Sequence, residues 1–460
     1  MGFLFCKKTG REDRAVRITF RGGVHPNEKK ELSRDAALRE FRPAGEMVFP
    51  LSQHIGKPAK PVVKKGDEVR CGQLIAEADG FVSANIHSSC SGTVKAVEKR
   101  RTISGTLQEC VVVENDGCFT PAEGIGEAEK WDSLSGEEIL ALVKAAGIVG
   151  MGGAGFPTHV KLAPKDPSKI RFVIANGAEC EPYLTCNDQL MRTCAAGIVE
   201  GLEITLRLFP NAEGVICLED NKPEAAEALR AAAAGKSRIS VRVLRTKYPQ
   251  GGERSLIRVI AGVDFPTAML PADVGCIVDN VGTLYAISRA VSFREPLTRT
   301  VVTLSGEAAA NPGNWWVPIG TRVSELLEAA GGLKNGTALK KVLAGGPMMG
   351  FAMSSLDVPC VKTTNGITLL PEDPAEEAAG RMTACLHCGR CTTVCPLGLT
   401  PQLMADAAYD EDYERYEKKL YGLDCIACGS CTYICPAKRP LTQTFKRTKA
   451  EILARRRAAK

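Results

Sequence analysis

The chain has 460 residues, of which 44% are hydrophobic and 24% charged, and its formal net charge is +6. This length predicts several domains, and the composition is ordinary for a soluble globular protein. No run of about 18 apolar residues is present, so no transmembrane helix is expected, and the apolar start MGFLF is too short for a secretory signal.

Much of the positive charge lies at the C-terminal end, in the stretches KRTK (446–449) and ARRRAAK (454–460). Aromatic residues make up only 5% of the chain, and none accompanies this tail as a stacking surface, so we expect no nucleic-acid partner. A solvated helix end, or contact with anionic lipid or an acidic protein, suits the tail better.

The first unit, residues 1–120, has valine-rich runs separated by turn-forming KKGD, CGQ, ADG and SG segments over residues 58–97. Short strands between such turns predict a small sandwich, and the pattern resembles a biotinyl/lipoyl-type barrel-sandwich hybrid. A true carrier domain would expose a modifiable lysine at its hairpin tip, whereas the tip here is Asp79-Gly80-Phe81. We therefore interpret this unit as a structural module.

The second unit, residues 121–298, begins with an amphipathic segment (135–147) in which Ser135 and Glu138 predict a helix capping box. The loop GMGGAGFPT (150–158) follows and supplies Gly150, Gly152, Gly153 and Gly155. Glycines let backbone N–H groups approach a phosphate or a ring closely, and Lys161 adds a positive charge. A strand, RFVIANG (171–177), comes only after the loop, which argues against a Rossmann motif. A glycine-rich turn without a ligand stays open as an alternative.

Two further segments of this unit predict a strand, a loop and a helix in succession. Residues 241–260 place Gly251-Gly252 before a helix that begins at Glu253, and residues 274–287 place Asp279-Asn280 before a helix opened by Thr283. A loop followed by a helix N-terminus can meet phosphate. Three such loops in one α/β domain predict a nucleotide site.

The third unit, residues 299–375, predicts a β-grasp module of the soluble-ligand-binding type, with two strands and then the helix SELLEAAGG. Such modules bind cobalamin in other proteins, but we favour a structural role. Trp315 and Trp316 are expected partly in the core and partly at an interface.

The fourth unit, residues 376–460, contains two C-x2-C-x2-C-x3-C-P runs, CLHCGRCTTVCP (385–396) and CIACGSCTYICP (425–436). Bacterial two-cluster ferredoxins carry this run, and its fourth cysteine ligates the other cluster. We therefore predict two [4Fe–4S] clusters, the first on Cys385, Cys388, Cys391 and Cys435, the second on Cys425, Cys428, Cys431 and Cys395. Zinc ribbons are the less suitable alternative, since they pair two C-x2-C arms. The spacer at 401–423 has helical composition, which predicts a helical ferredoxin-like domain.

The order GMGGAGFPTHVKL, NGAECEP, KYPQGGE, DNVGTL and the cysteine tail is similar to the flavoprotein subunit of respiratory complex I. It resembles still more closely the C subunit of the Rnf ferredoxin:NAD oxidoreductase complex. The resemblance implies a multidomain α/β protein in which FMN lies on the glycine loop, beside Lys161, and NAD(H) stacks above it. It further implies that the pocket is lined by Asn176, Glu179, Glu181, Tyr248, Gly251, Glu253, Asn280 and Thr283.

Four residues depart from the complex I pattern. Met151 stands where arginine is usual, Ala178 where aspartate is usual, Gly252 where the first of two acids is usual, and Asp279 where the first of two asparagines is usual. These changes leave the flavin-binding loop intact. They weaken the expectation of direct NADH contacts.

The resemblance implies a peripheral NADH, FMN and iron–sulfur subunit on the cytoplasmic face of the membrane. Its partners would be the membrane-embedded and iron–sulfur subunits of the same complex, with ferredoxin as an indirect donor. A flavin is required because hydride carries two electrons and a cubane cluster takes one. Two alternatives remain: a soluble NADH-oxidising protein of the proline-reductase-associated type, and a non-enzymatic iron–sulfur scaffold. The sequence does not say which cluster faces the flavin.

Overall fold

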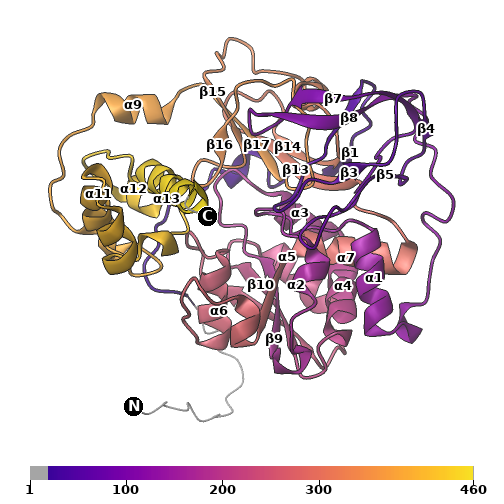
Figure 1. The fold of residues 1–460 in the computed structure, drawn as a ribbon, viewed down its shortest axis with the longest axis horizontal. Helices are drawn as coiled ribbons and strands as arrows, with labels where there is room; N and C mark the ends of the chain where they lie inside the picture. Colours follow the sequence, from indigo (N-terminus) through magenta and orange to yellow (C-terminus); the bar gives the residue numbers. More distant parts are fainter. Residues whose placement is uncertain (1–18, 459–460) are drawn as a thin grey trace.

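The computed structural model describes residues 19–458; the start of the chain, where no secretory signal is expected, and the last two residues lie outside them. The predicted fold class is confirmed, with a barrel-sandwich unit, an α/β unit, a β-grasp unit and a helical C-terminal unit in sequence order. Figure 1 shows the C-terminal helices lying beside the other units, joined to them through the segment that contains α9 (Pro374–Gly380).

The barrel-sandwich unit pairs two small antiparallel sheets. One has the order β2-β8-β7-β4 and the other β3-β5-β6. Their bounds are β2 (Met47–Pro50), β3 (Lys60–Pro61), β4 (Glu68–Val69), β5 (Leu74–Glu77), β6 (Ile86–His87), β7 (Gly92–Arg101) and β8 (Leu107–Asn115). Met47, Phe49, Ile75 and Val111 fill the space between the sheets and are fully buried. At the predicted tip, Phe81 is 81% exposed, and the Asp79 carboxylate forms an ion pair with Lys57 at 2.7 Å, a lysine that the hairpin itself does not carry.

The α/β unit is built on a parallel sheet in the order β11-β10-β9-β12. Its strands are β9 (Phe172–Gly177), β10 (Glu213–Glu219), β11 (Ile239–Leu244) and β12 (Cys276–Asn280). Alternate residues face opposite layers, so that Val173 packs into the large core while Ile174 packs with Leu256 on the other side. The helices are α1 (Gly136–Ala145), α2 (Thr158–Lys161), α3 (Cys186–Thr193), α4 (Ala195–Arg207), α5 (Pro223–Ala232), α6 (Glu253–Ala261) and α7 (Val281–Phe293).

Several local predictions for this unit are confirmed. The Ser135 side chain accepts a hydrogen bond from the Glu138 backbone N–H, and the Glu138 carboxylate accepts one from that of Ser135, which is the predicted capping box. Helix α6 begins at Glu253, as predicted. Helix α7 begins two residues before the predicted Thr283, because the Asn280 side chain accepts from Gly282 N–H and forms the N-cap.

The β-grasp unit has a mixed sheet in the order β1-β14-β13-β17-β15-β16. Its elements are β1 (Leu38–Glu40), β13 (Arg299–Ser305), β14 (Gly313–Pro318), α8 (Val323–Ala329), β15 (Lys341–Ala344), β16 (Phe351–Ala352) and β17 (Gly366–Leu370). Strand β1 comes from the predicted first unit but pairs with β14, so the N-terminal region contributes to two units. Trp315 lies in the β-grasp core, while Trp316 stacks near Tyr285 of α7, 5.5 Å between ring centroids.

The C-terminal unit is helical, as predicted from its spacer. It contains α10 (Arg390–Thr393), α11 (Pro401–Tyr409), α12 (Ser430–Ile434) and α13 (Leu441–Ala458). Met404, Tyr416 and Phe445 form its small core between α11 and α13. Across residues 19–458, no helix combines the length and apolar character needed to span a bilayer.

Candidate functional site

The region at the carboxyl ends of β9 and β12, here called the crevice, lies where the order of the parallel sheet reverses. The chain runs from β9 through β10 to β11 on one side, then returns to place β12 on the other side of β9. The carboxyl ends of β9 and β12 therefore diverge at a topological switch point, where open α/β sheets bind their ligands. Asn280 ends β12, and it is paired in register with Asn176, one residue before the end of β9. Both were predicted site residues, and the sheet brings them together.

The glycine loop lies over this crevice, between α1 and α2. Gly150 N–H donates to Phe156 O at 2.8 Å, and Met151 N–H donates to the buried Thr283 hydroxyl at 2.9 Å. Thr283 therefore anchors the loop to α7. Helix α1 precedes the loop and β9 follows it, which confirms that the motif is not a Rossmann loop.

The protein structure explains the need for glycine at some positions of the loop and not at others. Gly152 has φ +75°, and a Cβ there would lie 3.0 Å from the Asn280 amide nitrogen. Gly153 has no such constraint, since a Cβ there would meet no atom of the described part of the chain within 4 Å. The protein itself gives no reason for glycine at 153, whereas a planar or anionic ligand resting on the loop would require the open space.

Lys161 is held at the crevice by β12. Its ammonium donates to Val278 O at 2.7 Å and to Asp279 Oδ1 at 2.9 Å. Burial opposes the charge, but the Asp279 carboxylate outweighs burial and raises the pKa of Lys161. Two of its three N–H groups are used, so one is left for a ligand. Asp279 stands where the complex I pattern has asparagine. Its carboxylate therefore supplies part of the negative charge that this pattern has at positions 178 and 252, where this chain has alanine and glycine.

Asn176 and the loop before α6 close the far side of the crevice. The Asn176 side-chain amide donates to Gly251 O at 2.9 Å, which joins β9 to this loop. Glu253 begins α6, and part of its surface is open to solvent. The surrounding residues nevertheless desolvate its carboxyl and raise its pKa, and the charge of Lys161 offsets only part of this rise. The crevice thus brings together the glycine loop, Lys161, Asn176, Gly251, Glu253 and Asn280.

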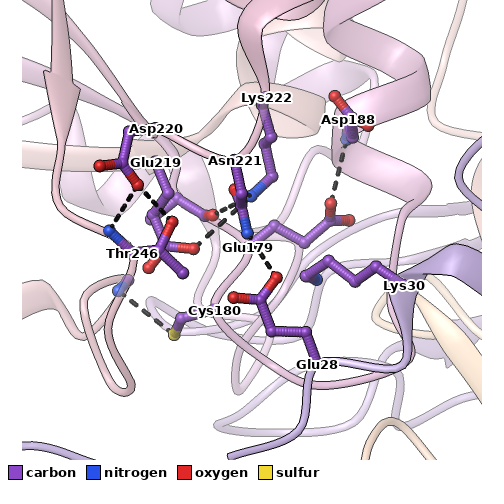
Figure 2. Close-up of polar contacts among 12 residues, drawn as sticks. Glu28, Lys30, Glu179, Cys180, Asp188, Glu219, Asp220, Asn221, Lys222 and Thr246 are labelled. Atoms are coloured by element: carbon purple, nitrogen blue, oxygen red, sulfur yellow. Dashed lines mark hydrogen bonds and ion pairs between the residues drawn. The ribbon is translucent and has the colours of Figure 1, made fainter. Parts of the chain in front are cut away.

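Two predicted acidic residues bind protein backbone. Glu179, at φ +49°, accepts hydrogen bonds from two N–H groups at the start of α3, that of Asn187 at 2.6 Å and that of Asp188 at 3.2 Å. Figure 2 shows the bond from Asp188. Glu181 accepts from the N–H groups of Met348 (2.6 Å) and Met349 (3.1 Å) in the β-grasp unit. Burial raises the pKa of both carboxyls. The charges of Lys30 and Lys222 oppose this rise at Glu179, and the N–H groups of Met349 and Met348 oppose it at Glu181. Both acids thus anchor the loop that follows β9 to neighbouring elements, and their predicted contact with flavin or nicotinamide stays a prediction.

A buried charged network, which no sequence motif indicated, also holds this loop (Figure 2). Lys222 donates to Ala178 O at 2.8 Å and lies 3.5 Å from Glu219, whose other oxygen accepts from Lys247 N–H. Burial raises the pKa of Glu219 to about 7, and Lys222 opposes the rise. The pair therefore ties the loop after β9 to the loop before α6.

Tyr248 was predicted in the flavin pocket, but the structure buries it against the cysteine tail. Its hydroxyl donates to Cys428 O at 2.6 Å, and its ring is 1% exposed. Val24 forms a β-bridge with Tyr248, and Gly23 N–H donates to Val394 O at 2.8 Å, beside Cys395. An N-terminal segment and the loop before α6 therefore both contact the C-terminal unit, at Val394 and Cys428.

The two cysteine quartets predicted from the sequence each surround one cavity. Cys385, Cys388, Cys391 and Cys435 line the first. Cys425, Cys428, Cys431 and Cys395 line the second. Within the described residues, no group of three or more His, Cys, Asp or Glu side chains is arranged to hold a single metal ion. Cysteines spread around a cavity suit a multi-iron cluster and do not suit a zinc ribbon.

Comparison with known proteins decides the family. The chain is 44% identical, over 94% of its length and 94% of the relative's, to the C subunit of the proton-translocating ferredoxin:NAD(+) oxidoreductase complex of Clostridium ljungdahlii. It is 42% identical, over 95% of its length and 98% of the relative's, to the C subunit of the Na(+)-translocating ferredoxin:NAD(+) oxidoreductase complex of Acetobacterium woodii. The chain belongs to this family, the RnfC family.

Family models match successive parts of this RnfC chain. The RnfC barrel sandwich hybrid domain matches residues 18–118, the Nuo51 FMN-binding domain 143–289, the SLBB domain 301–352, and the 4Fe-4S dicluster domain 381–436. A solved NAD+-reducing [NiFe]-hydrogenase is also similar, at 20% identity and a TM-score of 0.48, over 64% of this chain and 56% of that one. The FMN-binding model spans the whole crevice, and the dicluster model spans both cysteine runs. These two matches confirm the expected FMN and [4Fe–4S] cofactors.

Proposed function

We propose that this protein is the NADH-, FMN- and iron–sulfur-binding subunit of a membrane-bound ferredoxin:NAD oxidoreductase complex, where it interconverts hydride and single-electron transfer. The observation that carries the proposal is the direct contact between Tyr248, three residues before Gly251 of the crevice, and Cys428 of the second quartet. A nucleotide crevice in contact with a cluster cavity is the arrangement that such a conversion requires.

The residues of the crevice bind and orient the flavin. FMN supplies the chemistry that accepts hydride as an electron pair and releases single electrons. The N–H groups of the glycine loop and the α7 N-terminus provide donors for phosphate, and Lys161 provides a cation with one free N–H. Asn176 and Gly251 shape the opposite wall, while Glu253 is the exposed acid placed to meet NAD(H). No side chain of the protein has to form a covalent bond in this function.

The structure also supports an order for the two clusters. Cys428 of the second quartet is 7% exposed and is covered by Tyr248 and Met348 of the flavin-side units. Cys388 of the first quartet is exposed, beside Leu386, which is 62% exposed. We infer that the cluster on Cys425, Cys428, Cys431 and Cys395 exchanges electrons with the flavin. The cluster on Cys385, Cys388, Cys391 and Cys435 then exchanges them with a partner protein of the complex.

The two named relatives support a role in an ion-translocating complex. They are named for different ions, H+ and Na+, although their identities to this chain are nearly equal, at 44% and 42%. We therefore place ion selection in other subunits. We further propose that the protein binds the cytoplasmic face of the membrane through membrane-embedded and iron–sulfur partner subunits.

Purification of the full chain with reconstituted clusters tests the proposal. We expect one tightly bound FMN, about eight iron atoms from two [4Fe–4S] clusters, and NADH-dependent reduction of a viologen. A protein with clusters but without FMN or viologen reduction would be the iron–sulfur scaffold. A protein that has all of these but never co-purifies with membranes from its native cells would be the soluble NADH-oxidising type.

A further inference from the structure

A fully buried lysine of the β-grasp unit lies at the junction of three units. Lys362 is 0% exposed, and its backbone N–H donates to the Gln53 side chain of the barrel-sandwich unit at 3.1 Å. Burial lowers its pKa to about 7, and among the described residues no carboxylate is close enough to offset this shift. His54 and His87 also lie near Lys362; burial lowers the pKa of both imidazoles, and the Lys362 charge lowers them further, so they add no second cation to this junction. An unpaired lysine is costly to bury, so its contacts call for an explanation.

The Lys362 ammonium reaches the start of the glycine loop. It donates to Gly147 O at 2.6 Å and to Asn85 O. Gly147 follows the C-cap residue of α1 and has φ +64°; a Cβ there would lie 2.9 Å from the Lys362 nitrogen and 2.2 Å from Asn85 O. The carbonyls at a helix C-terminus carry partial negative charge, which favours a cation. Lys362 therefore fixes the point from which the chain enters the glycine loop, three residues before Gly150.

The neighbouring residue supports the other end of the loop. Gly155 has φ +70°, and a Cβ there would lie 2.9 Å from the Thr363 methyl group and 3.1 Å from Gln53 O. Residues 362 and 363 of the β-grasp unit thus contact both ends of the loop, at Gly147 and at Gly155. The α/β unit alone does not determine the conformation of its glycine loop.

We propose that Lys362 is a positioning residue for FMN, through which the β-grasp and barrel-sandwich units hold the glycine loop in its flavin-binding conformation. The inference rests on the proposed FMN site and deepens it, because it gives two otherwise structural modules a role in cofactor affinity. Lys362 itself does not touch the flavin; it acts through Gly147 and the loop that follows.

The test compares Lys362→Met with the wild-type chain, both with reconstituted clusters and stripped of flavin. Methionine keeps the length of the side chain but removes both hydrogen bonds and the buried charge. We expect the Kd for added FMN to rise about tenfold or more, since loss of two buried hydrogen bonds loosens the loop. Amide exchange in residues 147–157 of the flavin-free protein should become faster. Cluster content should be unchanged, because the side-chain hydrogen bonds of Lys362 go to Gly147 and Asn85, outside the C-terminal unit.

Lys340→Met, an exposed lysine of the same unit, is the matched control and should leave both measurements unchanged. Thr363→Ala provides a second variant in case Lys362→Met does not fold, and should weaken FMN binding because it removes the methyl group packed at Gly155. If folded Lys362→Met binds FMN as the wild type does, the positioning role is wrong; if it does not fold, wild-type affinity in Thr363→Ala has the same meaning. Failure of the wild type to bind FMN would instead refute the proposed function.

Discussion

The contact between Tyr248 and the second cysteine quartet gives the sharpest prediction. Tyr248→Phe removes only the hydroxyl that donates to Cys428 O at 2.6 Å. Because Tyr248 is 1% exposed and Cys428 is 7% exposed, the carbonyl is left buried without its donor, at a cost of about 1–3 kcal/mol. The covalent linker keeps the C-terminal unit attached, so this cost falls on its docking against the crevice. The docked population should fall about 5- to 150-fold relative to the undocked one.

Two measurements check this prediction. Proteolysis in the exposed linker around α9 should become faster, and stopped-flow mixing with NADH should show slower cluster reduction at unchanged flavin reduction. Tyr416→Phe is the matched control, since the Tyr416 hydroxyl is buried in the C-terminal core and has no hydrogen-bond partner among residues 19–458. Its removal should cost nothing. If both variants behave alike in both measurements, the Tyr248 hydroxyl does not hold the cluster against the flavin site.

Three further predictions concern stability. Ser135→Ala removes the cap of α1 and should lower the free energy of unfolding by about 1 kcal/mol in urea titrations, without changing cluster content. Gly201→Ala should cost about 3 kcal/mol or more, because its Cβ would lie 1.8 Å from Leu284 O between α4 and α7; Gly380→Ala, with no atom within 4 Å, should be neutral. The pKa of His87 is lowered to about 3, first by burial and then by Lys362, so the unfolded state takes up its proton first as the pH falls below 6.5. Stability should drop by about 2 kcal/mol from pH 8 to pH 5, and His87→Leu should remove that part of the pH dependence.

The residues that predict the cofactors of this protein lie in short stretches of its sequence. The spacing within each cysteine run is enough to predict a cluster site, because three ligands at intervals of three residues present their thiolates from one short loop. The capping box at Ser135 and the helix start at Glu253 depend on neighbours within three residues, and both were predicted correctly. The glycine loop was separable from a Rossmann motif for the same reason, since the order of helix, loop and strand is local information.

The roles of single buried polar groups were decided only by the tertiary structure. Glu181 and Met348 are 167 residues apart, Tyr248 and Cys428 are 180 apart, and Lys362 and Gly147 are 215 apart. A carboxylate, hydroxyl or ammonium group can satisfy its hydrogen bonds with a ligand or with any backbone group that the fold brings near. Sequence pattern identifies which chemistry is present, but long-range packing selects the partner of each polar atom. Long-range packing placed Tyr248 against Cys428 and Lys362 against Gly147, at the start of the glycine loop.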